Sequence, residues 1–391
     1  MPRRDRTAGR RPTGTHRAHP AAVAALAVLA TVLAACGGGT TDAGRPAATA
    51  TSPAGSAASA RAAPEPSAPG PTTRTPDAEP GPVTIAFAGD VHVEGPLRGR
   101  LADPATALAP VAPLLSGADL AVVNLESSVG TGGTPEPKRF RFQAPPTVFP
   151  ALTAAGVDIV TMANNHAKDF GDDGLAQTLA AVADAESGDP PLSVVGVGAD
   201  AAQAFAPAVR EVRGTTVAVI GAHSADDPTA DPTEQWAAAE GRPGVAVARD
   251  PNPLADVVRT VAATVDAVVV FMHWGVQGQA CPSESQRATA RALADAGATA
   301  VVGAHAHELQ GAGVLDRTYV AYGLGNFVWY RPGPSGVLTL TLLGGQVVGE
   351  AWTPALIGGD GLPVAAAGAE ADRLTAAFTA LRDCTDLTPL S

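Results

Sequence analysis

The chain has 391 residues, a formal net charge of −12 and 46% hydrophobic residues. The acidic balance and an aromatic content of 4% exclude a nucleic-acid binder, because cationic stripes for phosphates and aromatic platforms for bases are both lacking. The hydrophobic content excludes global disorder. Three cysteines are too few for a disulfide-dense small fold.

The N-terminal segment has the layout of an export signal. Six arginines accompany one acidic residue over residues 1–20, and residues 21–35 are small and aliphatic. The run ends Leu33-Ala34-Ala35-Cys36, which resembles the lipobox of bacterial lipoproteins, where the cysteine is diacylated and becomes the first mature residue. We expect a lipoprotein signal peptide over 1–35 and a lipid anchor at Cys36, on the outer face of the cytoplasmic membrane. The alternative is an ordinary signal peptide with a coincidental cysteine.

Residues 36–82 are predicted to be a tether. Residues 37–82 contain no Val, Ile, Leu, Met, Phe, Trp or Tyr, so they cannot contribute to a hydrophobic core. Their Ala, Pro, Gly, Ser and Thr predict a disordered segment that would hold a folded domain away from the membrane.

The predicted folded part begins at Val83 and extends to about residue 360. Strand patterns cover residues 83–88, 118–123, 157–162, 193–197, 215–220, 266–272, 299–302, 317–322 and 337–343. Helical patterns cover residues 146–155, 174–185, 253–264 and 284–296, the last opening with a capping box. Alternating apolar strands and helices predict an α/β fold with covered sheets. Residues 361–391 add a helix over 370–382 and a tail.

Polar side chains gather just beyond the ends of these predicted strands. Five of the six histidines that follow residue 36 lie there, namely His92, His166, His273, His305 and His307. Asp90, Asn124, Glu126 and Asn165 occupy similar places. Ligands bind beyond the carboxyl ends of strands in α/β sheets, so we expect one shared pocket. Imidazole, carboxylate and amide ligands suit Mn, Fe or Zn. A hydrogen-bonded structural role is the alternative for any single histidine.

These residues carry a family resemblance. Asp90-x-His92, Glu126, Asn165-His166, His273 and His305-x-His307 occur in the order of calcineurin-like metallophosphoesterases. Closer still is the resemblance to the CapA/PgsA group, associated with poly-γ-glutamate capsule synthesis; it is carried by Asn124-Leu125-Glu126, residues 163–171, His273-Trp274-Gly275 and residues 323–327. The resemblance covers roughly residues 83–328. It implies a four-layer α/β/β/α sandwich with two divalent metal ions.

The resemblance also implies a role for each motif residue. One metal ion would have the ligands Asp90, His92, Glu126 and His307. The second would have the bridging Glu126 together with Asn165, His273 and His305. His166 would be the catalytic general acid, and Asn124 and Asp169 would orient the ligands.

Three positions depart from the family pattern. Glu126 replaces the Asp of the wider superfamily, Ala304 stands where many relatives have His, and Gly313 stands where relatives often have Glu. The last departure leaves the substrate contacts at that position open. His92 is apolar in many CapA relatives, so its presence here favours metal binding.

The expected activity is metal-dependent hydrolysis of an exported phosphoester or of a polymer amide. The sequence has no Walker-type Gly-Lys-Ser/Thr loop, so we do not expect ATP-dependent ligation. The expected partners are an anionic polymer or phosphoester substrate, the membrane through the lipid anchor, and capsule synthesis or export proteins. The alternative is a non-catalytic component that binds or tethers polyglutamate in an export complex.

Other residues give weaker signals. Cys281 and Cys384 remain once Cys36 is acylated, which favours one disulfide in an exported chain, with two unpaired thiols as the alternative. Lys138, Arg139 and Arg141 are expected to form a solvated face, with capture of an anionic substrate as the second possibility. His223 is expected in a surface loop, with a place in the lining of the pocket as the alternative. Trp274 is expected to be a packed wall.

Overall fold

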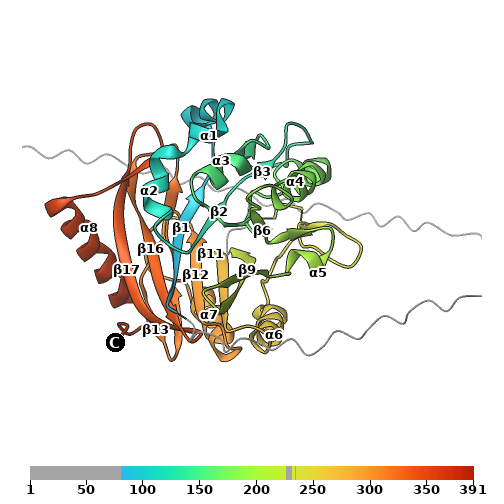
Figure 1. The fold of residues 1–391 in the computed structure, drawn as a ribbon. Helices are drawn as coiled ribbons and strands as arrows, with labels where there is room; N and C mark the ends of the chain where they lie inside the picture. The colour runs from blue at the N-terminus through green and yellow to red at the C-terminus, as the bar shows by residue number, and fades with distance from the viewer. Residues whose placement is uncertain (1–80, 226–230, 234) are drawn as a thin grey trace, which may run out of the picture. The chain divides into compact units, whose positions relative to one another are not determined.

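The computed structural model describes residues 81–225, 231–233 and 235–391 (Figure 1). The predicted signal peptide, Cys36 and nearly all of the predicted tether lie outside the described residues. Among the residues described, none of the helices combines the length and the apolar character needed to span a bilayer.

The first of two large sheets has the strand order β18-β17-β16-β1-β2-β5-β6, with β15 also pairing with β1. Its parallel part consists of β1 (Val83–Val91), β2 (Leu120–Leu125), β5 (Ile159–Thr161), β6 (Ser193–Val195) and β15 (Asn326–Val328). Its antiparallel part consists of β16 (Gly333–Leu343), β17 (Gln346–Ile357) and β18 (Pro363–Ala365).

The second sheet has the order β13-β14-β12-β11-β9-β8. Four parallel strands form its centre: β9 (Thr215–Ala225), β11 (Ala267–Gly275), β12 (Ala300–His305) and β14 (Thr318–Ala321). The antiparallel edges are β8 (Ala208–Val212) and β13 (Ala312–Leu315). Two short pairs complete the strands: β3 (Ser128–Val129) with β4 (Gln143–Ala144), and β7 (Val197–Gly198) with β10 (Gly244–Val245).

Side-chain alternation places the two sheets face to face. In β1, Ile85 and Phe87 pack with Val269 and Phe271 of β11 in one buried cluster, while Ala86 of β1 faces a different cluster. Successive side chains of a strand point to opposite faces, so a run that is buried throughout must be covered on both sides. The middle of the molecule is therefore the apolar layer between the sheets.

Helices cover the outer face of each sheet. The first sheet packs against α1 (Pro104–Ala107), α2 (Ala112–Leu115), α3 (Val148–Ala154) and α4 (Gly171–Glu186). The second packs against α6 (Pro251–Ala262) and α7 (Glu284–Asp295). The remaining helices are α5 (Ala201–Ala204), α8 (Gly368–Ala380) and the 3-10 turns η1 (Gly95–Ala102), η2 (Ala109–Val111) and η3 (Leu381–Cys384). The predicted α/β/β/α architecture is confirmed.

The nine predicted strands and five predicted helices are all present, with shifts at their ends. The capping box of α7 is formed, because the Ser283 side chain accepts from the Gln286 backbone and Gln286 Oε1 accepts from Ser283 N. The strand β17 was not predicted. The segment beyond residue 360 also contains β18, which pairs with β17, besides the predicted helix, which is α8. Figure 1 shows α8 running alongside β17.

Candidate metal centre

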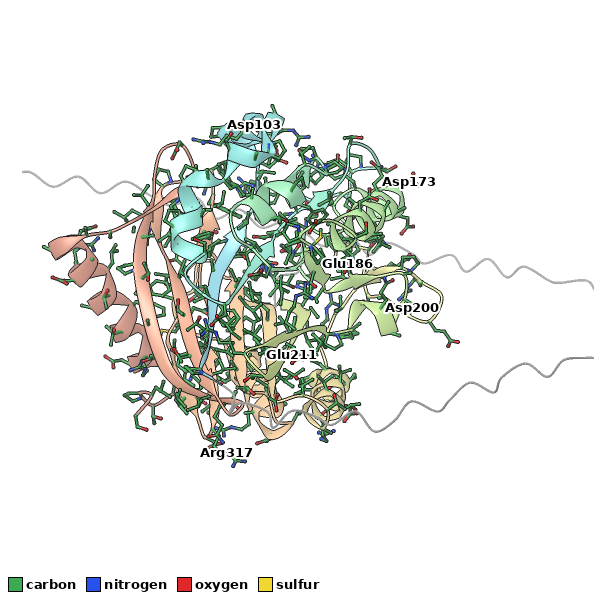
Figure 2. All side chains as sticks on the ribbon, viewed as in Figure 1. Asp103, Asp173, Glu186, Asp200, Glu211 and Arg317 are labelled. Atoms are coloured by element: carbon green, nitrogen blue, oxygen red, sulfur yellow. A yellow bond between two sulfur atoms is a disulfide. The ribbon has the colours of Figure 1, made fainter. Side chains whose placement is uncertain are left out.

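Most charged side chains lie at the surface, and Figure 2 labels examples such as Asp103, Asp173 and Arg317. Asp90 and Glu126 differ, because both are fully buried. Buried carboxylates are rare unless they are paired or bind metal. Asp90 lies near the end of β1 and Glu126 directly follows β2, and both meet histidines from the second sheet, so the site lies where the carboxyl ends of the two sheets meet.

Close backbone packing positions Asp90. A Cβ atom on Gly89 would lie 1.9 Å from the Gly325 carbonyl oxygen, so only glycine allows this approach. Asp90 N then donates to Gly325 O at 2.9 Å, and Asp90 Oδ2 accepts from His305 N at 3.1 Å. The Asp90 side chain therefore joins β1 of one sheet to β12 of the other.

Two groups of metal-ligating side chains share Glu126. The inner ligand group is Glu126, His273 and His305, and the outer ligand group is Asp90, Glu126 and His307. In each group the ligand atoms lie within 4.8 Å of one another. Asn165 adjoins the inner ligand group, since its Oδ1 lies 2.8 Å from His273 Nε2. This arrangement has the form of the predicted pair of sites bridged by Glu126.

His92 lies beside the centre but belongs to neither ligand group. It is buried, with ring centroids 4.0 Å from Trp329 and 4.7 Å from Phe142. Burial, followed by the charges of His166 and His307, lowers the pKa of His92 to about 3. His92 is therefore neutral at physiological pH, as a metal ligand must be.

Unpaired buried atoms test whether metal ions fit this site. In the part of the chain that the structure describes, both carboxylate oxygens of Glu126, both ring nitrogens of His92 and Nε2 of His305 have no hydrogen-bond partner. Such orphaned groups are costly, about 1–3 kcal/mol each, and rare in folded proteins. Divalent cations would satisfy the Glu126 oxygens and His305 Nε2, which belong to the ligand groups, and the N/O donor set suits Mn, Fe or Zn. The residues present therefore fit divalent metal ions.

The protonation of the two groups differs. Burial, followed by the charges of neighbouring histidines, holds the pKa values of His273 and His305 well below the usual range. Burial and the nearby Asp90 raise the pKa of Glu126. Burial would lower the pKa of His307, but Glu126, Asp90 and Asn326 raise it to about 9. In the metal-free protein a proton on His307 thus partly neutralises the two carboxylates.

The backbone at His305 and His307 is strained. His305 has a φ of 98° and His307 a φ of 56°, in the left-handed region that favours glycine. Such conformations cluster at functional sites and persist where the surroundings hold them. Asp90 Oδ2 holds His305 N, Asn326 Oδ1 lies 2.9 Å from His307 Nδ1, and Gly278 N donates to Ala306 O at 2.8 Å.

Two asparagines hold the ligand side chains in place. Asn124 Nδ2 donates to Asp90 Oδ1 at 2.7 Å and lies 3.2 Å from His273 Nδ1. Asn164 Nδ2 in turn donates to Asn124 Oδ1 at 3.0 Å. Asn124 therefore has the contacts of the predicted orienting residue, and Asn164 adds a support that was not predicted.

A buried chain of charges leads to His166. Its Nδ1 lies 2.5 Å from Asp169 Oδ2, and its Nε2 lies 3.6 Å from Glu126 Oε1. Lys138 Nζ pairs with Asp169 Oδ1 at 2.8 Å and also donates to the carbonyl oxygen of Asn165, a predicted metal ligand. Lys138 is buried, so the expectation of a solvated face is wrong for it, whereas Arg139 and Arg141 are exposed.

His223 and Trp274 sit on neighbouring strands of the second sheet. His223 pairs in register with His273, its Nδ1 lies 3.2 Å from His273 O, and it is buried. The preferred expectation of a surface loop is therefore wrong, because β9 continues past the predicted end of the strand. Trp274 is buried and donates from Nε1 to Tyr322 O at 2.7 Å, as expected of a packed wall.

Cys281 and Cys384 form a disulfide, with their Cα atoms 5.7 Å apart. Cys281 lies in the loop after β11, and Cys384 ends η3 after the C-terminal helix. The bond joins the C-terminal segment to the loop whose Gly278 contacts Ala306.

Residues 84–331 match the family model described as "Bacterial capsule synthesis protein PGA_cap". The chain belongs to this family. The matched segment contains all residues of both ligand groups, as well as His92, Asn165 and His166. The resemblance to the CapA group is confirmed.

Curated relatives of this family member match about half of it. A protein of Mycobacterium tuberculosis named "probable polyglutamine synthesis accessory protein" is 33% identical over 218 residues, which cover 54% of this chain and 55% of that protein. The PGA biosynthesis protein CapA of Bacillus subtilis is 34% identical over 172 residues, covering 44% and 42%. The chain spans about half the length of the curated relatives it matches.

Solved structures give more distant matches. A phosphatase of Mycoplasma pneumoniae aligns with a TM-score of 0.45 at 14% identity, covering 71% of this chain and 94% of that one. A hypothetical protein of Thermus thermophilus aligns with a TM-score of 0.42 at 16% identity, covering 70% and 98%.

Proposed function

We propose that this chain is a metal-dependent hydrolase of capsule or poly-γ-glutamate synthesis or processing, acting on a phosphoester or on a polymer amide. The observation that carries the proposal is Glu126, a buried carboxylate shared by two ligand groups with neither oxygen hydrogen-bonded to any described residue. Two bound divalent ions would activate water and stabilise the charge that develops during hydrolysis. Asp90 and His307 would hold one ion, and His273, His305 and Asn165 the other.

His166 is the residue placed to move a proton. Asp169 accepts from its Nδ1, so its Nε2 is directed toward the Glu126 side of the centre. Burial lowers the pKa of His166 although Asp169 opposes this, so the protonated ring would readily give up the proton on Nε2. Lys138 and the backbone N–H of Phe142, which donates at 2.6 Å, hold Asp169 in place.

The proposal includes the setting of the enzyme. The lipobox-like Leu33-Ala34-Ala35-Cys36 supports a lipid-anchored protein on the outer face of the cytoplasmic membrane. The family description and the name of the Bacillus subtilis relative support a capsule polymer as substrate and capsule synthesis or export proteins as partners.

A second function, a non-catalytic component that binds or tethers polyglutamate, is favoured by one observation. The Mycobacterium tuberculosis relative is named an accessory protein. Metal content and turnover separate the two functions.

The test begins with metal analysis of the purified full chain after supplementation with Mn, Fe or Zn. We expect about two divalent ions per chain and hydrolysis of bis(4-nitrophenyl) phosphate or release of glutamate from poly-γ-glutamate. A chain that binds no metal under any of these conditions would sink the hydrolase proposal. A chain that binds metal and polymer without turnover would favour the accessory function.

A further inference from the structure

A hollow of about 510 Å³ opens beside the aromatic side chains that pack on His92 and His166. Its wall includes three arginines and three aromatic residues, namely Arg139, Phe140, Arg141, Phe142, Tyr330 and Arg331. None of these residues belongs to either ligand group.

Aromatic side chains connect this hollow to the centre. Phe142 lines the hollow, and its ring lies 4.2 Å from His166 and 4.7 Å from His92. Tyr330 also lines the hollow, with its ring 4.9 Å from His92. A molecule lying in the hollow therefore sits one aromatic ring away from the proposed proton donor and from the centre.

Two of the three arginines pack on aromatic rings. The Arg139 guanidinium lies 4.9 Å above the Phe140 ring, and that of Arg331 lies 5.1 Å above the Tyr330 ring. Stacking on a ring orders the guanidinium fork and leaves its N–H groups free for an anion. Among the residues that the structure describes, no carboxylate pairs with Arg139, Arg141 or Arg331.

The wall contains one acidic side chain, and it is engaged elsewhere. Glu94 Oε1 accepts from Gln143 N at 3.0 Å and lies 3.4 Å from Arg98 Nη1. Arg141 Nη1 donates to the backbone carbonyl of Glu136 at 3.3 Å, so its charge too has no carboxylate partner among the described residues. Three such arginines in one hollow contrast with the formal charge of −12 of the whole chain. A local positive field on an acidic protein attracts anions to that place.

We propose that this hollow is a subsite for an anionic group, a carboxylate or a phosphate, that lies next to the bond cleaved in the substrate. Arg139, Arg141 and Arg331 recognise the group, so the centre prefers extended polyanions to substrates with a single charge. The link to cleavage rests on the proposed hydrolase function, whereas anion binding in the hollow does not.

Binding to the metal-free full chain tests the subsite without turnover. The test variant combines Arg139→Gln, Arg141→Gln and Arg331→Gln. The control variant removes the same charge from exposed arginines of α6, α7 and α8, through Arg259→Gln, Arg291→Gln and Arg373→Gln. The probes are γ-linked hexaglutamate and tripolyphosphate, measured by titration calorimetry.

We expect the test variant to lose about 10- to 100-fold in affinity for at least one probe, the loss of a few charge-assisted hydrogen bonds. The control variant should match the wild type. The probe that binds more tightly to the wild type identifies a carboxylate or a phosphate as the preferred group. Absence of binding by the wild type, or equal losses in both variants, would overturn the proposal.

Turnover by the metal-loaded chain separates this inference from the proposed function. The substrates are an aryl phosphodiester and the same ester carrying a distal carboxylate. The wild type should prefer the carboxylate ester, and this preference in kcat/KM should fall in the test variant and persist in the control. If neither ester is hydrolysed and no glutamate is released from poly-γ-glutamate, but the binding losses hold, the hydrolase proposal fails and the anion subsite stands.

Discussion

The two ligand groups share Glu126 but have different surroundings. In the inner ligand group, His273 and His305 are fully buried at the ends of adjacent parallel strands, and His305 Nδ1 lies 2.9 Å from His273 Nε2. In the outer ligand group, the His307 side chain is 23% exposed and packs against Trp329. One edge of the fold thus places a fully buried ligand group beside one that is partly open to solvent.

The pKa values of their histidines also distinguish the two ligand groups. The inner histidines have pKa values far below the usual range, so they are neutral and ready to bind an ion. The pKa of His307 is about 9, so an outer ion competes with a proton below that pH. The outer ion should therefore be the more weakly held of the two and the more sensitive to acid.

The largest effect should come from removing the residue that the groups share. Glu126→Ala deletes a ligand from both positions, so we expect both ions and all activity to be lost. Metal analysis and aryl phosphodiester turnover check this outcome. Glu308→Ala, at an exposed neighbour of His307, should keep both ions. Retention of one ion by Glu126→Ala would show that the two positions are independent.

Removal of one histidine at a time should separate the two positions. We expect a chelator to release metal from the wild type in a fast and a slow phase, the fast phase from the outer ligand group. His307→Ala should abolish the fast phase and His305→Ala the slow one, each leaving about one ion per chain. The fast phase of the wild type should accelerate as the pH falls below about 9. Two phases persisting in either variant, or loss of the slow phase in His307→Ala, would contradict the comparison.

His166 should affect turnover without affecting either ion. His166→Ala is expected to slow hydrolysis by about 10²–10⁴-fold, the usual contribution of general acid–base groups. The deficit should shrink for 4-nitrophenolate, which leaves without a proton, and grow for phenolate. Equal slowing with both leaving groups would remove His166 from the proton-transfer step.

The smallest effect is expected from Asp119, a carboxylate that precedes β2, whereas Glu126 follows it. Asp119 accepts from Thr84 N at 2.9 Å and from Arg213 Nε at 2.8 Å. Burial opposes its ionisation, but these contacts hold its pKa below the usual value. A lowered folded-state pKa stabilises the protein above the unfolded-state pKa, and this stability is lost as the pH falls through the folded-state value.

Asp119→Asn should therefore reduce the free energy of unfolding by about 1–3 kcal/mol at pH 7, with little difference from the wild type at strongly acidic pH. Denaturant unfolding at several pH values checks this. Asp256→Asn, in an exposed ion pair on α6, should be nearly neutral throughout. A constant difference across pH would show that ionisation of Asp119 does not matter. Metal content should not change, unlike in the variants of the centre.

The sequence predicts the parts of the fold that are buried on both faces. Strands such as β1, β2 and β11 are continuous apolar runs, so their ends, and the ligands beyond them, could be located from the sequence. The strand β17 was missed because most of its residues are exposed or partly exposed, including Glu350, which leaves no continuous apolar run. A strand whose residues are largely exposed forms because it pairs with neighbouring strands, and the local sequence does not contain that information.

The same distinction holds within the site. The residues of the two ligand groups could be located because they lie at or just beyond the ends of apolar strands, whereas the predicted ligand His92 is in neither group. Lys138 lies in a loop beside two exposed arginines. Its burial depends on Asp169 and Trp236, which are distant in sequence, and its ring contact with Trp236 spans 4.9 Å. The contacts of a long polar side chain are set by tertiary structure, so its neighbours in the sequence gave the wrong environment.

The stability of the protein depends on whether the bond between Cys281 and Cys384 forms when the chain is expressed. It closes a loop of 103 residues. In the chain-entropy model a loop of this size contributes about 4–5 kcal/mol. Material expressed in a reducing cytoplasm would carry two thiols instead, and its melting temperature would understate that of the oxidised protein. Chains truncated before residue 384 would share this deficit in any host, so thermal measurements should be made on protein folded in an oxidising compartment and retaining its C-terminal segment.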